Sequence, residues 1–109
     1  MEERYDVYGF KNAALKEIVL RLENDLGIQL LERDSGYYSG IYYLFKLAYG
    51  QELRLFNNFD PMRSDWVRES FKKYDLILEV SALPNMNEIQ KKLINGYQNV
   101  TLLSSRILK

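Results

Sequence analysis

Two consecutive apolar runs in the middle of the chain constrain the fold more than any other feature. In residues 41–49, apolar side chains occupy both alternating sets of positions. A strand of this composition is covered on both faces and lies inside a sheet. Gly50-Gln51 then predicts a tight hairpin turn into a second strand over residues 52–58, in which Leu53 and Leu55 share one face. The chain must therefore build a sheet and a further layer to cover it.

The covering layer is predicted to be helical. Before Gly27, apolar residues recur at steps of three and four, as on one stripe of a helix: Leu15, Ile18, Val19, Leu22 and Leu26. Asn12 is expected to cap this helix, or the helix begins a residue or two earlier, and Gly27 is expected to end it.

The rest of the chain predicts six further elements, one turn and one break. They are a first strand or extended arm at Tyr5 to Phe10, a strand at Ile28 to Arg33, a turn at Asp34-Ser35-Gly36, a break at Asn57 to Pro61, a short helix from Ser64 through Phe71, a strand at Leu76 to Val80, a helix from Asn85 or Asn87 to Gly96, and a strand at Val100 to Leu103. This order predicts a single α+β domain over residues 1–109. Its sheet is expected to be mixed but mainly antiparallel, a three-strand meander plus a βαβ-like unit, with helices packed mainly on one face.

The residue types that are missing restrict the chemistry. The chain of 109 residues has no cysteine and no histidine. Disulfides, thiolate or imidazole zinc sites and the Ser-His and Cys-His nucleophile pairs are therefore excluded. A cluster of carboxylates at Glu32, Asp34 and Asp60 is the remaining catalytic or metal-binding alternative, and no nucleophile accompanies it. We expect no enzymatic activity, no metal and no cofactor.

Charge and hydropathy restrict the partners. The formal net charge is zero, although residues 81–109 hold one acidic and four basic residues. A nucleic-acid-binding domain normally carries a basic excess, so direct nucleic-acid binding is not expected. No apolar run approaches the roughly 20 residues of a membrane span, and residues 1–4 do not resemble a secretory signal. We expect a cytoplasmic protein that does not bind membranes.

Two segments have the composition of a protein-binding surface. Residues 34–43 contain four tyrosines and two glycines, and residues 60–66 combine an arginine with the single tryptophan. Tyrosine, tryptophan and arginine are enriched at the centres of protein interfaces. In the alternative interpretation, Tyr43 and Trp66 belong to the core and the glycines serve only the turn.

The middle of the chain resembles the small immunity proteins of bacterial polymorphic-toxin systems, including contact-dependent growth inhibition. The resemblance covers about half of the chain and follows several features in order. They are the helix ending at Leu26-Gly27, the segment Glu32-Arg33-Asp34-Ser35, the glycine-flanked run Tyr37-Tyr38-Ser39-Gly40-Ile41-Tyr42-Tyr43, the strand Leu53-Arg54-Leu55-Phe56-Asn57-Asn58, and the apolar strand Leu76-Ile77-Leu78-Glu79-Val80.

The resemblance implies an antitoxin that binds a cognate toxin domain, commonly a nuclease, and blocks its active site or its access to substrate. Such an inhibitor needs a stable scaffold and a contact surface rather than catalytic residues. The residues that we predict for toxin binding are Asp34, Tyr37, Tyr38, Asp60, Arg63 and Asp65. Two alternatives remain: an adaptor or regulatory domain for an unrelated protein, and a small enzyme or small-ligand-binding domain lined by Tyr42 and Phe56.

Overall fold

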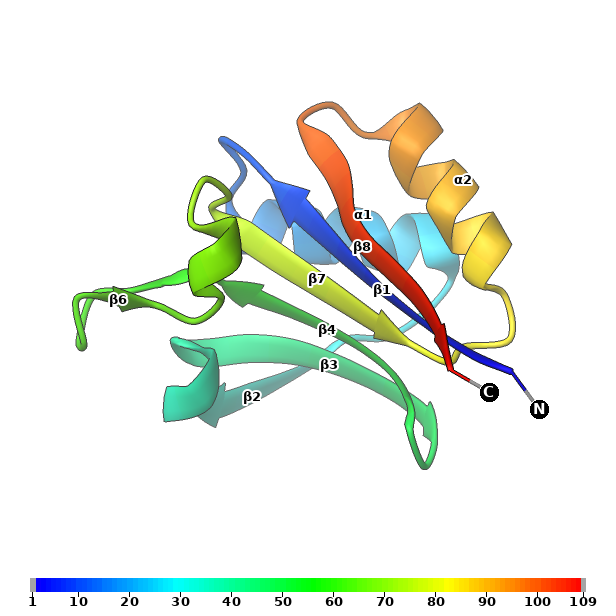
Figure 1. Ribbon diagram of the computed structural model, residues 1–109, viewed down its shortest axis with the longest axis horizontal. Coiled ribbons are helices and arrows are strands. Elements are labelled where there is room, and N and C mark those ends of the chain that lie inside the picture. The colour runs from blue at the N-terminus through cyan, green and yellow to red at the C-terminus, as the bar shows by residue number, and fades with distance from the viewer. Residues whose placement is uncertain (1, 109) are drawn as a thin grey trace.

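The computed structural model describes residues 2–108, which form a six-stranded antiparallel sheet and two helices (Figure 1). The main elements are β1 (Glu3–Phe10), α1 (Leu15–Leu26), β2 (Leu31–Ser35), β3 (Gly40–Ala48), β4 (Gln51–Asn57), β7 (Leu76–Ser81), α2 (Met86–Gly96) and β8 (Val100–Leu108). The strand order is β2-β3-β4-β7-β1-β8. A small second sheet pairs β5 (Phe59–Asp60) with β6 (Asp65–Trp66), and the 3-10 turns η1 (Gly36–Tyr38) and η2 (Glu69–Phe71) complete the described chain.

The α+β class and the mainly antiparallel character of the sheet are confirmed, but the sheet is not mixed. Every pairing between described strands is antiparallel. The predicted meander is β2-β3-β4, and the predicted βαβ-like unit is β7-α2-β8. In that unit β1 lies between β7 and β8 and pairs with both, so the two parallel strands never touch (Figure 1). The first strand of the chain therefore converts a mixed sheet into an antiparallel one.

Both helices cover the same face of the sheet and close one hydrophobic core. The predicted stripe of α1 is confirmed, since Ile18, Val19 and Leu22 are buried in a cluster with the inner side chains of α2. The central strands β1, β4 and β7 contribute alternate residues to that cluster: Tyr8, Phe10, Leu53, Leu55, Leu76, Leu78 and Val80. Each large apolar side chain buried in this way contributes about 1.5–3 kcal/mol to folding.

The start of α1 differs from the prediction. The helix begins at Leu15 after Ala14, and Asn12 adopts a left-handed conformation with φ 52°. The Asn12 backbone N–H donates to the Asp75 carboxylate at 2.6 Å, so this residue makes a turn against the loop before β7 instead of capping the helix. The predicted end is confirmed, because Gly27 follows the helix in the left-handed region with φ 64°.

The strand predicted at residues 28–33 is displaced along the chain. β2 occupies Leu31–Ser35, so the turn expected at residues 34–36 begins later, at η1. Residues 28–30 are held by α1, since the Leu30 N–H donates to the Glu23 carboxylate at 2.9 Å. In the next hairpin, Tyr49 and Gly50 form the turn and Gln51 already belongs to β4.

The short helix expected from Ser64 through Phe71 does not form. That stretch contains β6 and η2, and Ser64 lies in a turn with φ 52°. Residues 58–75 fold over the sheet face opposite the helices, where the ring of Tyr74 packs on Gly9. A β-carbon at Gly9 would lie 2.6 Å from that ring, so only glycine allows this approach. This crossing segment builds one wall of the candidate site.

Candidate binding site

A hollow of about 180 Å³ lies between η1 and the β5–β6 hairpin. The two segments come together at the same end of the molecule (Figure 1). Aromatic, acidic and basic side chains share the lining with one glycine and one valine: Gly36, Tyr37, Asp60, Arg63, Asp65, Trp66, Val67 and Arg68. The hollow therefore combines residues from two loops that are more than 20 positions apart in the chain.

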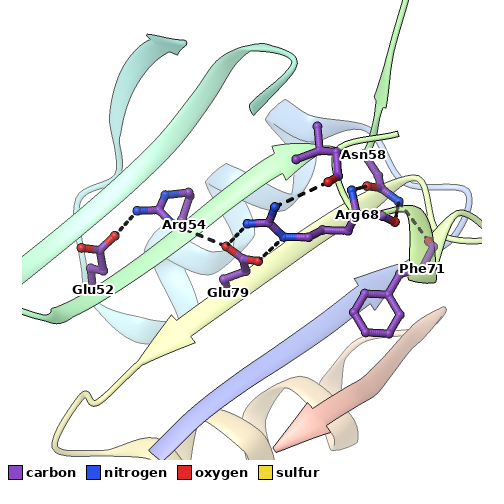
Figure 2. A network of polar contacts seen from close by, with 7 residues as sticks. Glu52, Arg54, Asn58, Arg68, Phe71 and Glu79 are labelled. Atoms are coloured by element: carbon purple, nitrogen blue, oxygen red, sulfur yellow. Dashed lines mark hydrogen bonds and ion pairs between the residues drawn. The ribbon is translucent and has the colours of Figure 1, made fainter. Parts of the chain in front are cut away.

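Asn58 holds the hairpin segment in place. It has no exposed surface, and its Nδ2 donates to the carbonyls of Phe71 at 2.9 Å and Tyr74 at 3.2 Å. Its Oδ1 accepts the Arg68 N–H at 2.8 Å (Figure 2). These bonds satisfy buried backbone groups that no strand or helix pairs, and they explain why the segment coils around one side chain.

A row of alternating charges forms the base beside the hollow. Glu79 lies between two arginines in Figure 2, with Arg68 Nε at 2.7 Å and an Arg54 guanidinium nitrogen at 3.4 Å. Arg54 also donates to Glu52. The hydrogen bonds that Arg68 donates to the Glu79 carboxylate raise the pKa of Arg68 further above its usual range. The Arg68 side chain is thereby fixed in one orientation, with its charge neutralised.

The ring of Tyr38 packs against this row of charges and against two other aromatic rings. Its ring lies 4.8 Å from the ring of Tyr42 and 5.2 Å from that of Phe56. The Arg54 guanidinium stacks on the Tyr38 ring at 4.5 Å. Because Phe56 has no exposed surface, it cannot line the small-ligand pocket that the sequence allowed with Tyr42.

The two carboxylates of the hollow differ in burial. Asp60 is 6% exposed, and its Oδ1 accepts the Met62 N–H at 2.9 Å, while its Oδ2 lies 3.9 Å from Arg63 Nε. Asp65 is exposed, and its Oδ1 accepts the Trp66 N–H at 2.8 Å. Both side chains thus stabilise the hairpin turn, and both residues line the hollow.

The structure brings together four of the six residues predicted for toxin binding, namely Tyr37, Asp60, Arg63 and Asp65. Tyr38 lies next to them but is turned onto the sheet. Asp34 is exposed at the end of β2 and does not line the hollow.

The carboxylate cluster that the sequence allowed is not assembled. Glu32 accepts the Tyr43 hydroxyl at 3.1 Å, away from the hollow that contains Asp60. Within residues 2–108, no group of three or more acidic side chains is arranged to hold a metal ion. Tyr43 is buried, as the alternative interpretation of the tyrosine segment expected, and burial followed by the bond to Glu32 raises its pKa.

A second buried carboxylate, which sequence reasoning did not find, lies beneath α2. Asp6 is 1% exposed and accepts hydrogen bonds from Arg4 Nε at 3.0 Å, the Ser105 hydroxyl at 2.6 Å and the Tyr8 hydroxyl at 3.3 Å. Arg4 also donates to Asn87 and Gln90 of α2. Burial and the nearby Asp6 raise the pKa of Tyr8 well above its usual value. This cluster ties β1, β8 and α2 together.

The burial of Asn58 and Asp6, the two polar residues that the sequence analysis did not single out, is not indicated by any local sequence pattern. Asn58 sits in a stretch whose composition indicates only a break, and Asp6 sits in a weakly alternating strand. Their partners, such as Phe71 and Ser105, are far away along the chain.

None of the described helices is long and apolar enough to cross a membrane.

Comparisons with known proteins do not assign the chain to a family. No protein-family model matches the chain, and no curated protein matches it.

Proposed function

We propose that the chain is an immunity protein, which binds a cognate toxin domain and neutralises it through the hollow and its rim. The observation that carries the binding part is the convergence of Tyr37 with Asp60, Arg63 and Asp65 on one surface. The sequence predicts all four as interface residues, and they come from two separate loops.

The rim of the hollow, formed by Tyr37, Phe59 and Met62, favours a protein partner over a small metabolite. Tyr37 is 79% exposed and Met62 is 93% exposed, and Phe59 is also partly exposed. Exposed aromatic and methionine side chains beside charged groups are typical of protein interfaces. Below them, Asn58 and the Glu79 ion pairs hold the backbone rigid. A preorganised surface loses less conformational entropy on binding, and this favours affinity.

The toxin part of the proposal rests on the resemblance in the middle of the chain, which implies a cytoplasmic antitoxin for one cognate toxin domain, commonly a nuclease. An inhibitor of this kind acts by occupying the active site or by covering the path of the substrate. Its own surface needs no reacting group. Complementary charge at the rim would mainly accelerate capture and exclude toxins of other systems.

The test is co-expression with the C-terminal domain encoded by the adjacent upstream gene. We expect a stable complex and rescue of cells that express that domain. In the double variant Tyr37→Ala/Asp60→Ala, we expect affinity to fall at least about 30-fold, as for the loss of an interface hot spot. Thermal unfolding of the variant checks that the fold is retained.

Tyr49→Ala is the matched control. Tyr49 is 98% exposed at the β3–β4 turn and lies outside the hollow. The control should bind like the unmodified protein. Absence of both a complex and rescue would contradict the toxin assignment, whereas a complex that tolerates the double variant would contradict the assigned surface.

A further inference from the structure

The hollow has the size of a receptor for one side chain. Its volume of about 180 Å³ is well below the 300–1,000 Å³ that is usual for cofactor and small-molecule pockets. It opens on the same surface as Tyr37 and Asp65, both of which are exposed. A protein partner that covers this surface would therefore insert a single anchoring group.

The charges within the hollow favour a cation. Arg68 is already neutralised by two hydrogen bonds to Glu79, at 2.7 and 3.1 Å. Asp65 has no basic side chain within 4 Å among the described residues. With Arg68 neutralised by Glu79, the lining holds the two carboxylates of Asp60 and Asp65 against the single positive charge of Arg63, so it retains an excess of negative charge.

Asp60 is an incompletely paired buried carboxylate. It is more than nine-tenths buried, and within residues 2–108 its Oδ2 has Arg63 Nε as its one partner, at 3.9 Å. That distance exceeds a hydrogen bond. The Arg63 side chain is 64% exposed, so it is only weakly constrained. A better-oriented cation from outside would improve the pairing of Asp60 without unfolding the hairpin.

The aromatic residues of the lining complete a site for a planar cation. Tyr37 and Trp66 both line the hollow, and Trp66 is held by edge contact with Phe59 at 5.0 Å between ring centroids. Aromatic faces attract guanidinium groups, and carboxylates bind them in a bidentate manner. The same lining disfavours an anion, because Asp60 and Asp65 would repel it.

We propose that the hollow binds an arginine side chain of the partner protein, held by the carboxylates of Asp60 and Asp65 and by the rings of Tyr37 and Trp66. This inference rests on the proposed function, since it names the group by which the partner is recognised. The partner's guanidinium displaces Arg63 from Asp60 as it enters.

The first experiment uses a small probe and needs no partner. N-acetyl-arginine amide is titrated into the ¹⁵N-labelled protein, and the indole N–H of Trp66, the single tryptophan, reports binding. We expect saturable shifts at Trp66 and at residues 36–37 and 60–68, with an affinity in the millimolar range. N-acetyl-citrulline amide has almost the same shape without the charge, and it should bind at least tenfold more weakly.

Two variants locate the site. Gly36 lines the hollow, its φ is outside the left-handed region, and a β-carbon there would point toward Arg63 at 3.7 Å. Gly36→Leu should therefore fill the hollow without straining the backbone and abolish binding of the arginine probe. Asp65→Asn should weaken the probe at least threefold. Asp34→Asn, on the exposed end of β2 and outside the lining, should leave the affinity unchanged.

The same variants applied to the toxin complex separate this inference from the proposed function. Loss of the complex in Gly36→Leu, with loss of probe binding, supports both. Retention of the complex in Gly36→Leu, when Tyr37→Ala/Asp60→Ala abolishes it, overturns the arginine site and leaves the immunity function intact. Equal shifts with arginine and citrulline amides, shifts away from the hollow, or no binding of the arginine probe also overturn it.

Discussion

Two buried carboxylates, Asp6 and Asp60, lie on opposite faces of the sheet and have opposite degrees of pairing. Asp6 receives hydrogen bonds from Arg4, Tyr8 and Ser105, and both of its oxygens are occupied. From the described part of the chain, Asp60 receives one hydrogen bond, from the Met62 N–H at 2.9 Å, and its second oxygen has only Arg63, at 3.9 Å. Both residues are less than 10% exposed, so burial alone does not distinguish them.

This difference in pairing indicates which of the two carboxylates is available to a binding partner. A buried carboxylate is costly unless cations and donors compensate it, and Asp6 is compensated within the chain. Its cluster can accept nothing further without breaking contacts between β1, β8 and α2. Asp60 lines a solvent-accessible hollow, and among the described residues no hydrogen bond to its Oδ2 is formed. The same residue type is therefore a structural group on one face and a candidate recognition group on the other.

The largest expected effect is loss of stability in Asp6→Ala. Removal of the carboxylate leaves the buried Tyr8 hydroxyl without its acceptor and Arg4 without its charge partner. We expect the free energy of unfolding to fall by about 3 kcal/mol, the lower end for a broken buried pair, because Arg4 keeps Asn87 and Gln90. Urea denaturation measures the change.

Glu88→Ala provides the control for a surface ion pair. Glu88 is exposed and lies 3.3 Å from Lys92 on α2, so its loss should cost less than about 1 kcal/mol. Equal effects in Asp6→Ala and Glu88→Ala would show that the Asp6 cluster stabilises the fold no more than a surface ion pair does.

Asn58→Ala is expected to have the next largest effect. The substitution removes the donors of two well-formed bonds to backbone carbonyls and the acceptor of the Arg68 N–H. The Phe71 carbonyl still accepts the Tyr74 N–H, but the Tyr74 carbonyl and the Arg68 N–H lose their partner in Asn58, which should cost about 2–3 kcal/mol. Hydrogen exchange of residues 59–75 should accelerate more than that of the sheet, because the segment depends on this side chain.

The neighbouring exposed residue gives a matched variant. Asn57 precedes Asn58 at the end of β4, and its side chain makes none of these bonds. Asn57→Ala should leave hydrogen exchange in residues 59–75 unchanged. If residues 59–75 remain protected from hydrogen exchange in Asn58→Ala, then Asn58 does not hold this segment in place and does not support the site.

Alkaline pH tests the Asp6 cluster without a loss of packing volume. Burial first, and then Asp6, raise the pKa of Tyr8 above the ordinary 10 of a phenol. The unfolded chain therefore loses this proton first, so stability is retained below pH 10 and declines as pH rises toward the pKa of the folded state. The loss due to Tyr8 is about 1.4 kcal/mol for each pH unit above 10.

In Tyr8→Phe, the decline above pH 10 should be shallower by the contribution of one proton. Tyr97 provides an independent comparison, since burial and Asp25 also raise its pKa. Tyr97→Phe should reduce the slope in the same direction. A slope that neither variant changes would contradict the burial of these phenols in the folded protein.

Local patterns predicted the parts of the fold that depend on neighbouring residues. The stripe of α1 and the alternation of Leu53 and Leu55 involve residues two to four positions apart, and both are confirmed. The antiparallel sheet depends instead on β1 lying between β7 and β8, a choice made by strands far apart in sequence. The missing helix near Ser64 likewise depends on Asn58, whose bonds outcompete a weak amphipathic stripe.

The candidate site was predictable to a similar extent. Composition identified two loops, and the fold brings Tyr37 close to Asp60 and Asp65. Composition did not distinguish Tyr37 from Tyr38, because consecutive residues of η1 point in different directions and only Tyr38 meets the rings of Tyr42 and Phe56. It also did not reveal that Asp60 is buried, since this depends on the hairpin closing around it.

The smallest expected change in stability comes from Asp60→Asn. This variant tests whether the Asp60 carboxylate, unlike that of Asp6, is dispensable for the fold. The amide oxygen still accepts the Met62 N–H, and only the loose contact with Arg63 is lost. The free energy of unfolding should change by less than about 1 kcal/mol, whereas affinity for the arginine probe should fall at least tenfold. Asp6→Asn should show the reverse, with a clear loss of stability and unchanged probe affinity. If Asp60→Asn destabilises the protein as strongly as Asp6→Asn, then Asp60 is a structural carboxylate, and the distinction between the two faces fails.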